Sequence, residues 1–194
     1  MAHRLRVLVA GLLVVLVSAG TACADQRDEW NGLIEQWNAT SEEVTALDVQ
    51  GIKRLTEVDA IDPYAENAAD ALPLLAEAQA LYLERTEKVE SLVALCDQMA
   101  DLDVSEERGV YAGQQKEIAE TMLEDHAVLS ELIARLQILY DASRTSTLSQ
   151  TDLDRLEQEI DDLRTREEEL FRRLIEMEKA SRQYWEDNTL GGTD

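Results

Sequence analysis

The chain has few of the residues that usually carry chemistry or covalent stability in a small protein. Its 194 residues include two cysteines, Cys23 and Cys96, and two histidines. Two cysteines cannot form a disulfide framework, and the sequence has no CxxC pair or Cys/His cluster of the kind that binds zinc. There are two prolines, and no run of β-branched residues alternates with polar ones. These shortages exclude a disulfide scaffold and argue against a β-rich fold, so stability has to come from the packing of helices.

Basic residues are also scarce. The chain has 18 Lys and Arg against 41 Asp and Glu, and its formal net charge at pH 7 is −23. All the acidic residues follow Ala24, whereas Arg4 and Arg6 precede it, so the part after Ala24 is even more acidic. Such a surface repels phosphate backbones and anionic lipid head groups. We therefore expect no nucleic-acid partner, whereas a basic protein is a compatible one.

Only one long apolar run is present, at residues 7–17, where it follows a short basic start and precedes small residues. The run is too short to span a bilayer and has the form of the apolar core of a secretory signal. We predict that residues 1–23 are a signal peptide and that the protein is extracytoplasmic. Residues 24–194 are predicted to form a single helical-bundle domain, because this length suits one domain.

Two cleavage sites compete at the end of the apolar run. Ala22-Cys23-Ala24 fits the small-x-small rule, and a cut after Ala24 would discard Cys23 and release a secreted protein. Gly20-Thr21-Ala22-Cys23 is instead a degenerate lipobox, with glycine where leucine is usual. A diacylated Cys23 would anchor the chain to the cell membrane. Because cysteine is rare here and one lies directly after the apolar run, we favour lipidation of Cys23.

Apolar residues spaced by three and four predict helices over nearly all of the remaining chain. The first helix is predicted at 27–58. Gly51 lies on its apolar face, where it either permits the close approach of another helix or weakens this one. A second helix is predicted to begin at Pro63 behind an Asp62 cap, and Pro73 either kinks or restarts it. The apolar stripe of the first helix consists of Trp30, Leu33, Trp37, Val44, Leu47, Leu55 and Val58.

Capping patterns mark the start of two further helices. The third is predicted to begin near Asp103, which has capping-box spacing to Glu106. Ser149 is the predicted cap of the fourth, and Leu148 and Leu153 flank it at hydrophobic-staple spacing.

The fourth predicted helix has the clearest seam, with alternating steps of three and four as in a coiled coil. Glu167 and Ser181 are its two polar members. The seam consists of Leu153, Leu156, Ile160, Leu163, Glu167, Leu170, Leu174, Met177, Ser181 and Tyr184. Since the links between helices are short, neighbours should run antiparallel. We predict an all-α fold, an elongated antiparallel four-helix bundle with coiled-coil-like packing. The alternative is a three-helix bundle with a loosely attached first helix.

Candidate catalytic groups are few after the signal peptide. His126 is the one histidine there, and position 123 is leucine, so the Glu-x-x-His motif of di-iron bundles is missing. We interpret His126 as a surface histidine. Cys96 lies on an apolar stripe between Leu92 and Met99, and we interpret it as an inert core residue. Without a nucleophile–base pair or a set of metal ligands, we predict a non-enzymatic protein with no metal and no cofactor.

Aromatic residues are predicted to meet at one end of the bundle. In the antiparallel arrangement Trp30, Trp37, Tyr111, Tyr184 and Trp185 fall at the same end, close to Cys23. They either close that end of the core or offer a surface to lipid head groups, a glycan or a partner, and we take Trp30, Tyr111 and Trp185 as candidate binding residues. Tyr184 continues the seam and should be buried. Trp185, about 100° further round the helix, should lie at the edge or outside.

The sequence also resembles a known family. The "GTAC" segment, the long acidic helices after it, the tyrosine-containing stretch 111–140 and the "TLSQTDLDRLEQEIDDL" restart are similar to features of the cell-wall-binding helical lipoproteins of Gram-positive bacteria. The resemblance is architectural and covers most of the chain after the signal peptide. It implies an anchor at Cys23 and binding to cell-wall glycan. We predict an envelope or cell-wall binding or spacer module. The alternative is a secreted, chaperone-like adaptor for a basic or apolar protein.

Overall fold

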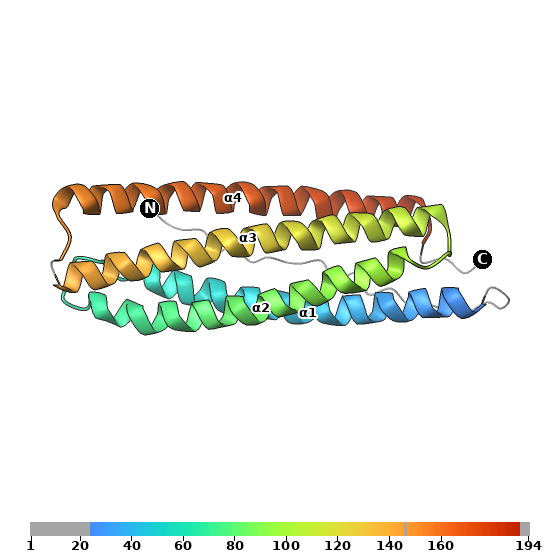
Figure 1. The fold of residues 1–194 in the computed structure, drawn as a ribbon, viewed down its shortest axis with the longest axis horizontal. Helices are drawn as coiled ribbons and strands as arrows, with labels where there is room; N and C mark the ends of the chain where they lie inside the picture. Colours follow the sequence, from blue (N-terminus) through green and yellow to red (C-terminus); the bar gives the residue numbers. More distant parts are fainter. Residues whose placement is uncertain (1–23, 146, 191–194) are drawn as a thin grey trace. The chain divides into compact units, whose positions relative to one another are not determined.

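The computed structural model describes residues 24–145 and 147–190, and within these residues the chain is all-helical, without strands. Four long helices pack against each other, and Figure 1 shows their arrangement. The all-α prediction and the number of helices are therefore confirmed. The predicted signal peptide and Cys23 lie outside the described residues. The elements are α1 (Ala24–Asp59), the short 3₁₀ helix η1 (Ala68–Asp70), α2 (Ala71–Ala100), α3 (Glu106–Thr145) and α4 (Gln150–Asp187).

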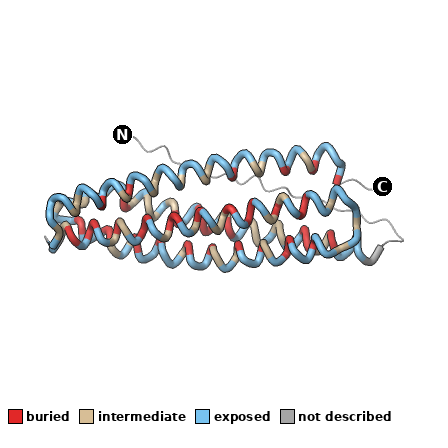
Figure 2. Tube along the Cα trace, turned by 45° about the horizontal axis from the view of Figure 1, so that its top comes forward, coloured by how far each residue is buried: buried red, intermediate tan, exposed pale blue. Residues whose placement is uncertain are grey.

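The chain divides into two compact units. Unit 1 contains the described residues of Thr45–Thr86 and Asp125–Glu169, and unit 2 contains 24–44, Glu87–Glu124 and 170–190. Each unit holds a segment of all four long helices. Buried and exposed positions alternate along every helix, as Figure 2 shows. This is the pattern of helices that bury one apolar face.

The predicted seam of α4 faces inward. Each of its ten members is buried or half-buried, whereas the residues between them are mostly exposed. Leu156 and Ile160 join the core of unit 1, and Leu163 packs partly buried against it. Leu174 and Ser181, in unit 2, are 6% and 2% exposed. The three-four spacing therefore identified the buried face of this helix correctly.

The start of α2 differs from the prediction. The helix begins at Ala71 and not at Pro63, because residues 62–65 form a turn in which Asp62 Oδ1 accepts a hydrogen bond from the Tyr64 N–H at 2.9 Å. Pro73 is the third residue of α2, where a missing N–H costs no intrahelical bond. Of the two roles considered for Pro73, the restart is therefore the correct one.

The cap of α3 also differs, while that of α4 agrees. Ser105, not Asp103, caps α3, because its Oγ accepts a hydrogen bond from the Arg108 N–H at 3.3 Å. Ser149 caps α4 as predicted. Its Oγ accepts from the Asp152 N–H at 3.2 Å and donates to the Asp152 carboxylate at 2.7 Å. Both serines satisfy a backbone donor that would otherwise be free in the first turn.

The end of α1 is fixed by a buried tyrosine in unit 1. The Tyr140 hydroxyl of α3 lies 3.0 Å from the Val58 carbonyl oxygen and 2.8 Å from that of Ile61. The Val58 carbonyl also accepts a hydrogen bond from the Ile61 N–H at 2.9 Å, so the hydroxyl is its second donor, and it also satisfies the Ile61 carbonyl just after the helix. The contact ties α3 to the point where α1 stops.

Gly51 allows α2 to approach α1 closely in unit 1. A Cβ atom at this position would lie 2.7 Å from Cζ and 2.9 Å from Cε2 of the Tyr82 ring. Tyr82 is itself 2% exposed and cannot move into solvent. The sequence left two roles open for Gly51, and the structure shows that it permits close helix approach.

The substitution Gly51→Ala is expected to destabilise the protein by about 1–2 kcal/mol in urea unfolding. Overpacking a core costs about 1–3 kcal/mol, and the gain of about 1 kcal/mol in helix propensity offsets only part of it. Gly32→Ala is the matched control on the same helix, since a Cβ at Gly32 has no atom within 4 Å. Gly32→Ala should stabilise the protein. Equal stabilisation by both substitutions would contradict the close approach at Gly51.

Candidate functional site

A buried arginine in unit 1 is held by carboxylates from two other helices. Arg85 of α2 is 2% exposed. Its Nε lies 2.5 Å from Asp48 Oδ1 of α1, and its Nη2 lies 3.5 Å from Asp125 Oδ2 of α3. Both aspartates are 7% exposed. The first is a short ion pair, whereas the second is longer than a charge-assisted hydrogen bond. Asp48 is therefore the closer partner of the guanidinium.

The fourth helix adds another carboxylate to this cluster. Glu167 of α4 is half-buried, and its negative charge raises the pKa of both Asp125 and Tyr82. Each of the four helices thus contributes at least one charged residue, namely Asp48, Arg85, Asp125 and Glu167. We call these four residues the charged cluster. Three of them are acidic and one is basic.

Burial dominates the acid–base properties of the charged cluster. It raises the pKa of Asp48 above the ordinary 3.8, although Arg85 acts in the opposite direction. Burial also has the largest effect on Asp125. Arg85 opposes it, Glu167 and Asp48 add to it, and the pKa of Asp125 rises to about 7. A carboxyl with such a pKa changes its protonation state within the neutral pH range.

The prediction of a surface His126 is wrong in one respect, because the side chain is half-buried. Its Nε2 lies 3.1 Å from Ser130 Oγ, and its Nδ1 is buried without a hydrogen-bond partner among the described residues. Burial and the charge of Arg85 lower the pKa of His126. Both effects favour the neutral imidazole, as expected beside a cation in an apolar environment.

Sequence reasoning missed Asp48, Arg85 and Asp125 and treated Glu167 only as an interruption of a seam. A signal was nevertheless present. The apolar stripe of α2 skips the step occupied by Arg85, between Tyr82 and Val89. In α3 the apolar positions Met122 and Leu129 are seven residues apart, and Asp125 occupies the step between them in the same way. Two gaps filled by residues of opposite charge indicate a buried ion pair, provided that the two helices are neighbours.

The three candidate binding residues come together in unit 2. The Trp30 and Trp185 rings are stacked at a centroid distance of 5.9 Å, and the Tyr111 ring meets Trp185 edge-on at 4.7 Å. Arg108 lies over Trp30, with its Cζ 5.2 Å from the ring centroid. The sequence predicted that these aromatic residues would meet. Trp30 is 1% exposed, and Tyr111 and Trp185 are each 6% exposed. The three rings therefore mainly close the core.

The prediction that Trp185 lies at the edge of α4 or outside is wrong. Trp185 is buried and Tyr184 is half-buried. Trp185 follows the buried Ser181 by four residues and therefore lies on the same face. A helix of 3.6 residues per turn drifts by about 20° per heptad from a strict seven-residue repeat. Near the end of α4 the buried face has therefore shifted from the heptad position, Tyr184, to the next residue, Trp185. The stacking of Trp185 on Trp30 favours this rotation.

Cys96 of α2 is a core residue, as predicted. It is 0% exposed, and burial raises the pKa of its thiol to about 12. A thiol with so high a pKa carries almost no thiolate at neutral pH and is a poor nucleophile.

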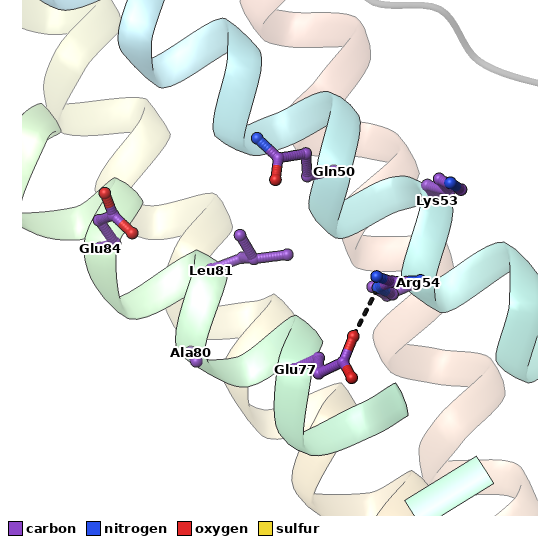
Figure 3. A pocket seen from close by; sticks show the side chains of 7 residues that line it. All are labelled: Gln50, Lys53, Arg54, Glu77, Ala80, Leu81 and Glu84. Atoms are coloured by element: carbon purple, nitrogen blue, oxygen red, sulfur yellow. Dashed lines mark ion pairs between the residues drawn. The ribbon is translucent and has the colours of Figure 1, made fainter. Parts of the chain in front are cut away.

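A surface groove of about 420 Å³ lies between α1 and α2 in unit 1. Figure 3 shows the Arg54 and Glu77 side chains pointing toward one another across it, with Arg54 Nε 2.7 Å from Glu77 Oε2. All the lining residues are exposed or half-buried, so water reaches the groove freely. Its lining consists of Gln50, Lys53, Arg54, Glu77, Ala80, Leu81 and Glu84.

Comparison with known proteins gives no relative, because no family model, curated protein or solved structure matches the chain. Within residues 24–145 and 147–190, no group of three or more His, Cys, Asp or Glu side chains is arranged to hold a metal ion. None of the helices described is both long and apolar enough to cross a bilayer. The charged cluster and the aromatic contacts are thus the features from which function can be inferred.

Proposed function

We propose that the protein is a non-enzymatic, extracytoplasmic helical lipoprotein that acts as a binding or spacer module of the cell envelope. One observation supports this above all. The described part of helix α1 starts at Ala24, the residue that follows Cys23 in the sequence. A lipid on Cys23 would therefore be attached next to the described helical fold. The fold that we propose with this function is a signal peptide followed by one elongated antiparallel bundle with coiled-coil-like packing.

The position of the aromatic residues fits a tethered end. Trp30 follows Ala24 by six residues, which is about 9 Å along a helix. The packed rings of Trp30, Tyr111 and Trp185 would therefore lie close to the anchor and stiffen the part of unit 2 next to it. Cell-wall glycan, which the family resemblance implies, is a candidate ligand of this end.

The charge of the chain makes the lipid necessary in this proposal. A formal net charge of −23 repels the anionic head groups of a membrane. Attachment then has to come from the acyl chains, and two chains suffice for stable anchoring where one does not.

The alternative is a chaperone-like adaptor, which would need an exposed apolar surface. Large apolar residues at least 44% exposed occur in the described part of the chain, but they are spread over all four long helices and the α1–α2 link. Single exposed apolar residues are normal on soluble proteins, so this distribution favours the spacer. These residues are Val49, Tyr64, Leu83, Val110, Ile138 and Ile175.

The anchor is tested by Cys23→Ala, which should move the protein from the membrane fraction to the soluble fraction. Cys96→Ala is the matched control and should stay with the membrane, because Cys96 is a buried core residue. Intact mass of the native protein identifies the acyl chains. A soluble wild-type protein with Asp25 as its first residue would contradict the proposal and favour free secretion.

A further inference from the structure

The charged cluster of unit 1 holds three carboxylates against one guanidinium. Asp48 faces Arg85 from α1, Asp125 faces it from α3, and Glu167 acts on Asp125 from α4. If all three were ionised, this largely buried region would carry an excess of negative charge. Burying an unbalanced charge is costly, and proteins commonly avoid the cost by taking up a proton.

The geometry indicates which carboxyl takes the proton. Asp48 Oδ1 lies 2.5 Å from Arg85 Nε, so ionised Asp48 is stabilised by a direct, short contact. Asp125 Oδ2 lies 3.5 Å from Arg85 Nη2, beyond the length of a charge-assisted hydrogen bond. Asp125 therefore receives less compensation from the cation than Asp48, while being equally buried at 7% exposure.

We propose that Asp125 is a proton-operated switch within unit 1. When protonated, it sits beside the Asp48–Arg85 pair as a neutral group, and the four helix segments of the unit hold together. When ionised, it adds an uncompensated negative charge between α2, α3 and α4, and the segments separate more readily. This inference does not depend on the lipid anchor or on any partner.

The direction of the pH dependence follows from the pKa of Asp125, which is raised to about 7 from 3.8. A group whose folded-state pKa is raised contributes stability that is fully present at low pH and is lost as the pH rises through the folded pKa. Stability from Asp125 should therefore fall between about pH 4 and pH 7. For these two pKa values, linkage gives an increase of about 30-fold in the unfolding constant between pH 5.5 and 8.5.

The charges of the cluster also act on two other titratable groups, Tyr82 and His126, whose effects must be separated from that of Asp125. Burial raises the pKa of Tyr82 far above the neutral range, so Tyr82 stays protonated throughout the experiment. The pKa of His126 is lowered from 6.5, so its contribution is lost as the pH falls and has the opposite sign. The experiment is therefore carried out in parallel in a His126→Gln background.

Urea unfolding between pH 5.5 and 8.5 tests the switch in the purified protein. Asp125→Asn should remove most of the 30-fold pH dependence. Glu167→Gln should move its midpoint to lower pH, because it removes a charge that raises the pKa of Asp125. Asp161→Asn, at an exposed position of α4, is the control and should keep the wild-type profile.

If Asp125→Asn does not fold, a direct titration of Asp125 tests the switch. The side-chain carboxyl carbon of Asp125 is followed by NMR in the wild-type protein, and a midpoint near pH 7 supports the switch. A midpoint below about pH 5 overturns it. A folded Asp125→Asn protein that keeps the wild-type pH profile overturns it as well.

Discussion

Replacing Arg85 with methionine should destabilise the protein by about 3–5 kcal/mol, the usual cost of breaking a buried ion pair from one side. The substitution keeps most of the side-chain volume but removes the one cationic member of the charged cluster. Asp48 and Asp125, each 7% exposed, would then be buried next to one another without a counter-charge. Chemical denaturation at pH 7 measures the loss.

Arg135→Met is the matched control on α3. Arg135 pairs with Glu131 at 3.4 Å and with Glu159 at 3.1 Å, but its side chain is 36% exposed. Exposed ion pairs contribute at most about 1 kcal/mol, so this substitution should have a small effect. If the two substitutions cost the same, the charged cluster is hydrated in solution and its burial is not the source of its importance.

The pH dependence of the Arg85→Met loss provides a second check. Arg85 lowers the pKa of Asp48 and of Asp125, so its removal should raise both values. Protonated aspartates tolerate burial better than ionised ones. The destabilisation should therefore be smaller at pH 5.5 than at pH 8, whereas an effect on packing alone would be the same at both.

Replacing the whole cluster tests whether its charges stabilise the fold or specify it. When all members of a buried ionic cluster are replaced by apolar residues of similar volume, stability is often unchanged or higher. We expect Asp48→Leu, Arg85→Met and Asp125→Leu together to recover most of the loss caused by Arg85→Met alone. Such a recovery would mean that the charges do not stabilise the fold on balance, which leaves the register of α1, α2 and α3 as the property that they would specify.

The helices were predictable because their signals are local. A stripe with steps of three and four is visible within one helix, and it identified the inward face of α4 from Leu153 to Tyr184. Ser149 was found for the same reason, since its capping pattern spans only four residues. The cap of α3 was wrongly placed at Asp103, although its spacing to Glu106 is just as local, because the choice between Asp103 and Ser105 depends on how the backbone enters the helix.

The charged cluster was not predictable in the same way, because it depends on the register between helices. Asp48 meets Arg85 only if α1 and α2 are aligned at that level, and no local pattern sets this alignment. Gly51 and Tyr82 contribute to it, since the glycine admits the ring one turn away from the ion pair. The gap in the α2 stripe at Arg85 was visible, but its meaning required knowledge of the neighbour.

Truncation of Trp30 should have the other large effect, a loss of about 3–5 kcal/mol for Trp30→Ala. Trp30 is 1% exposed and has ring contacts with Tyr111 and Trp185. Trp30→Phe should cost less, because it keeps a ring and removes an indole N–H that has no hydrogen-bond partner among the described residues. Tyr64→Ala, at a side chain that is 55% exposed, is the control and should be nearly neutral.

Trp185→Ala separates the structural role of the aromatic residues from a binding role. A Trp185 that served only a ligand would leave stability unchanged when truncated. Because Trp185 is 6% exposed and stacks on Trp30 at 5.9 Å, we expect a loss close to that of Trp30→Ala. In the double substitution the losses should not add, with a coupling of about 0.5–1.5 kcal/mol for the ring pair. Simple additivity in urea unfolding would mean that the two rings are not packed together in solution. Trp185 would then again be available to a glycan or a lipid head group.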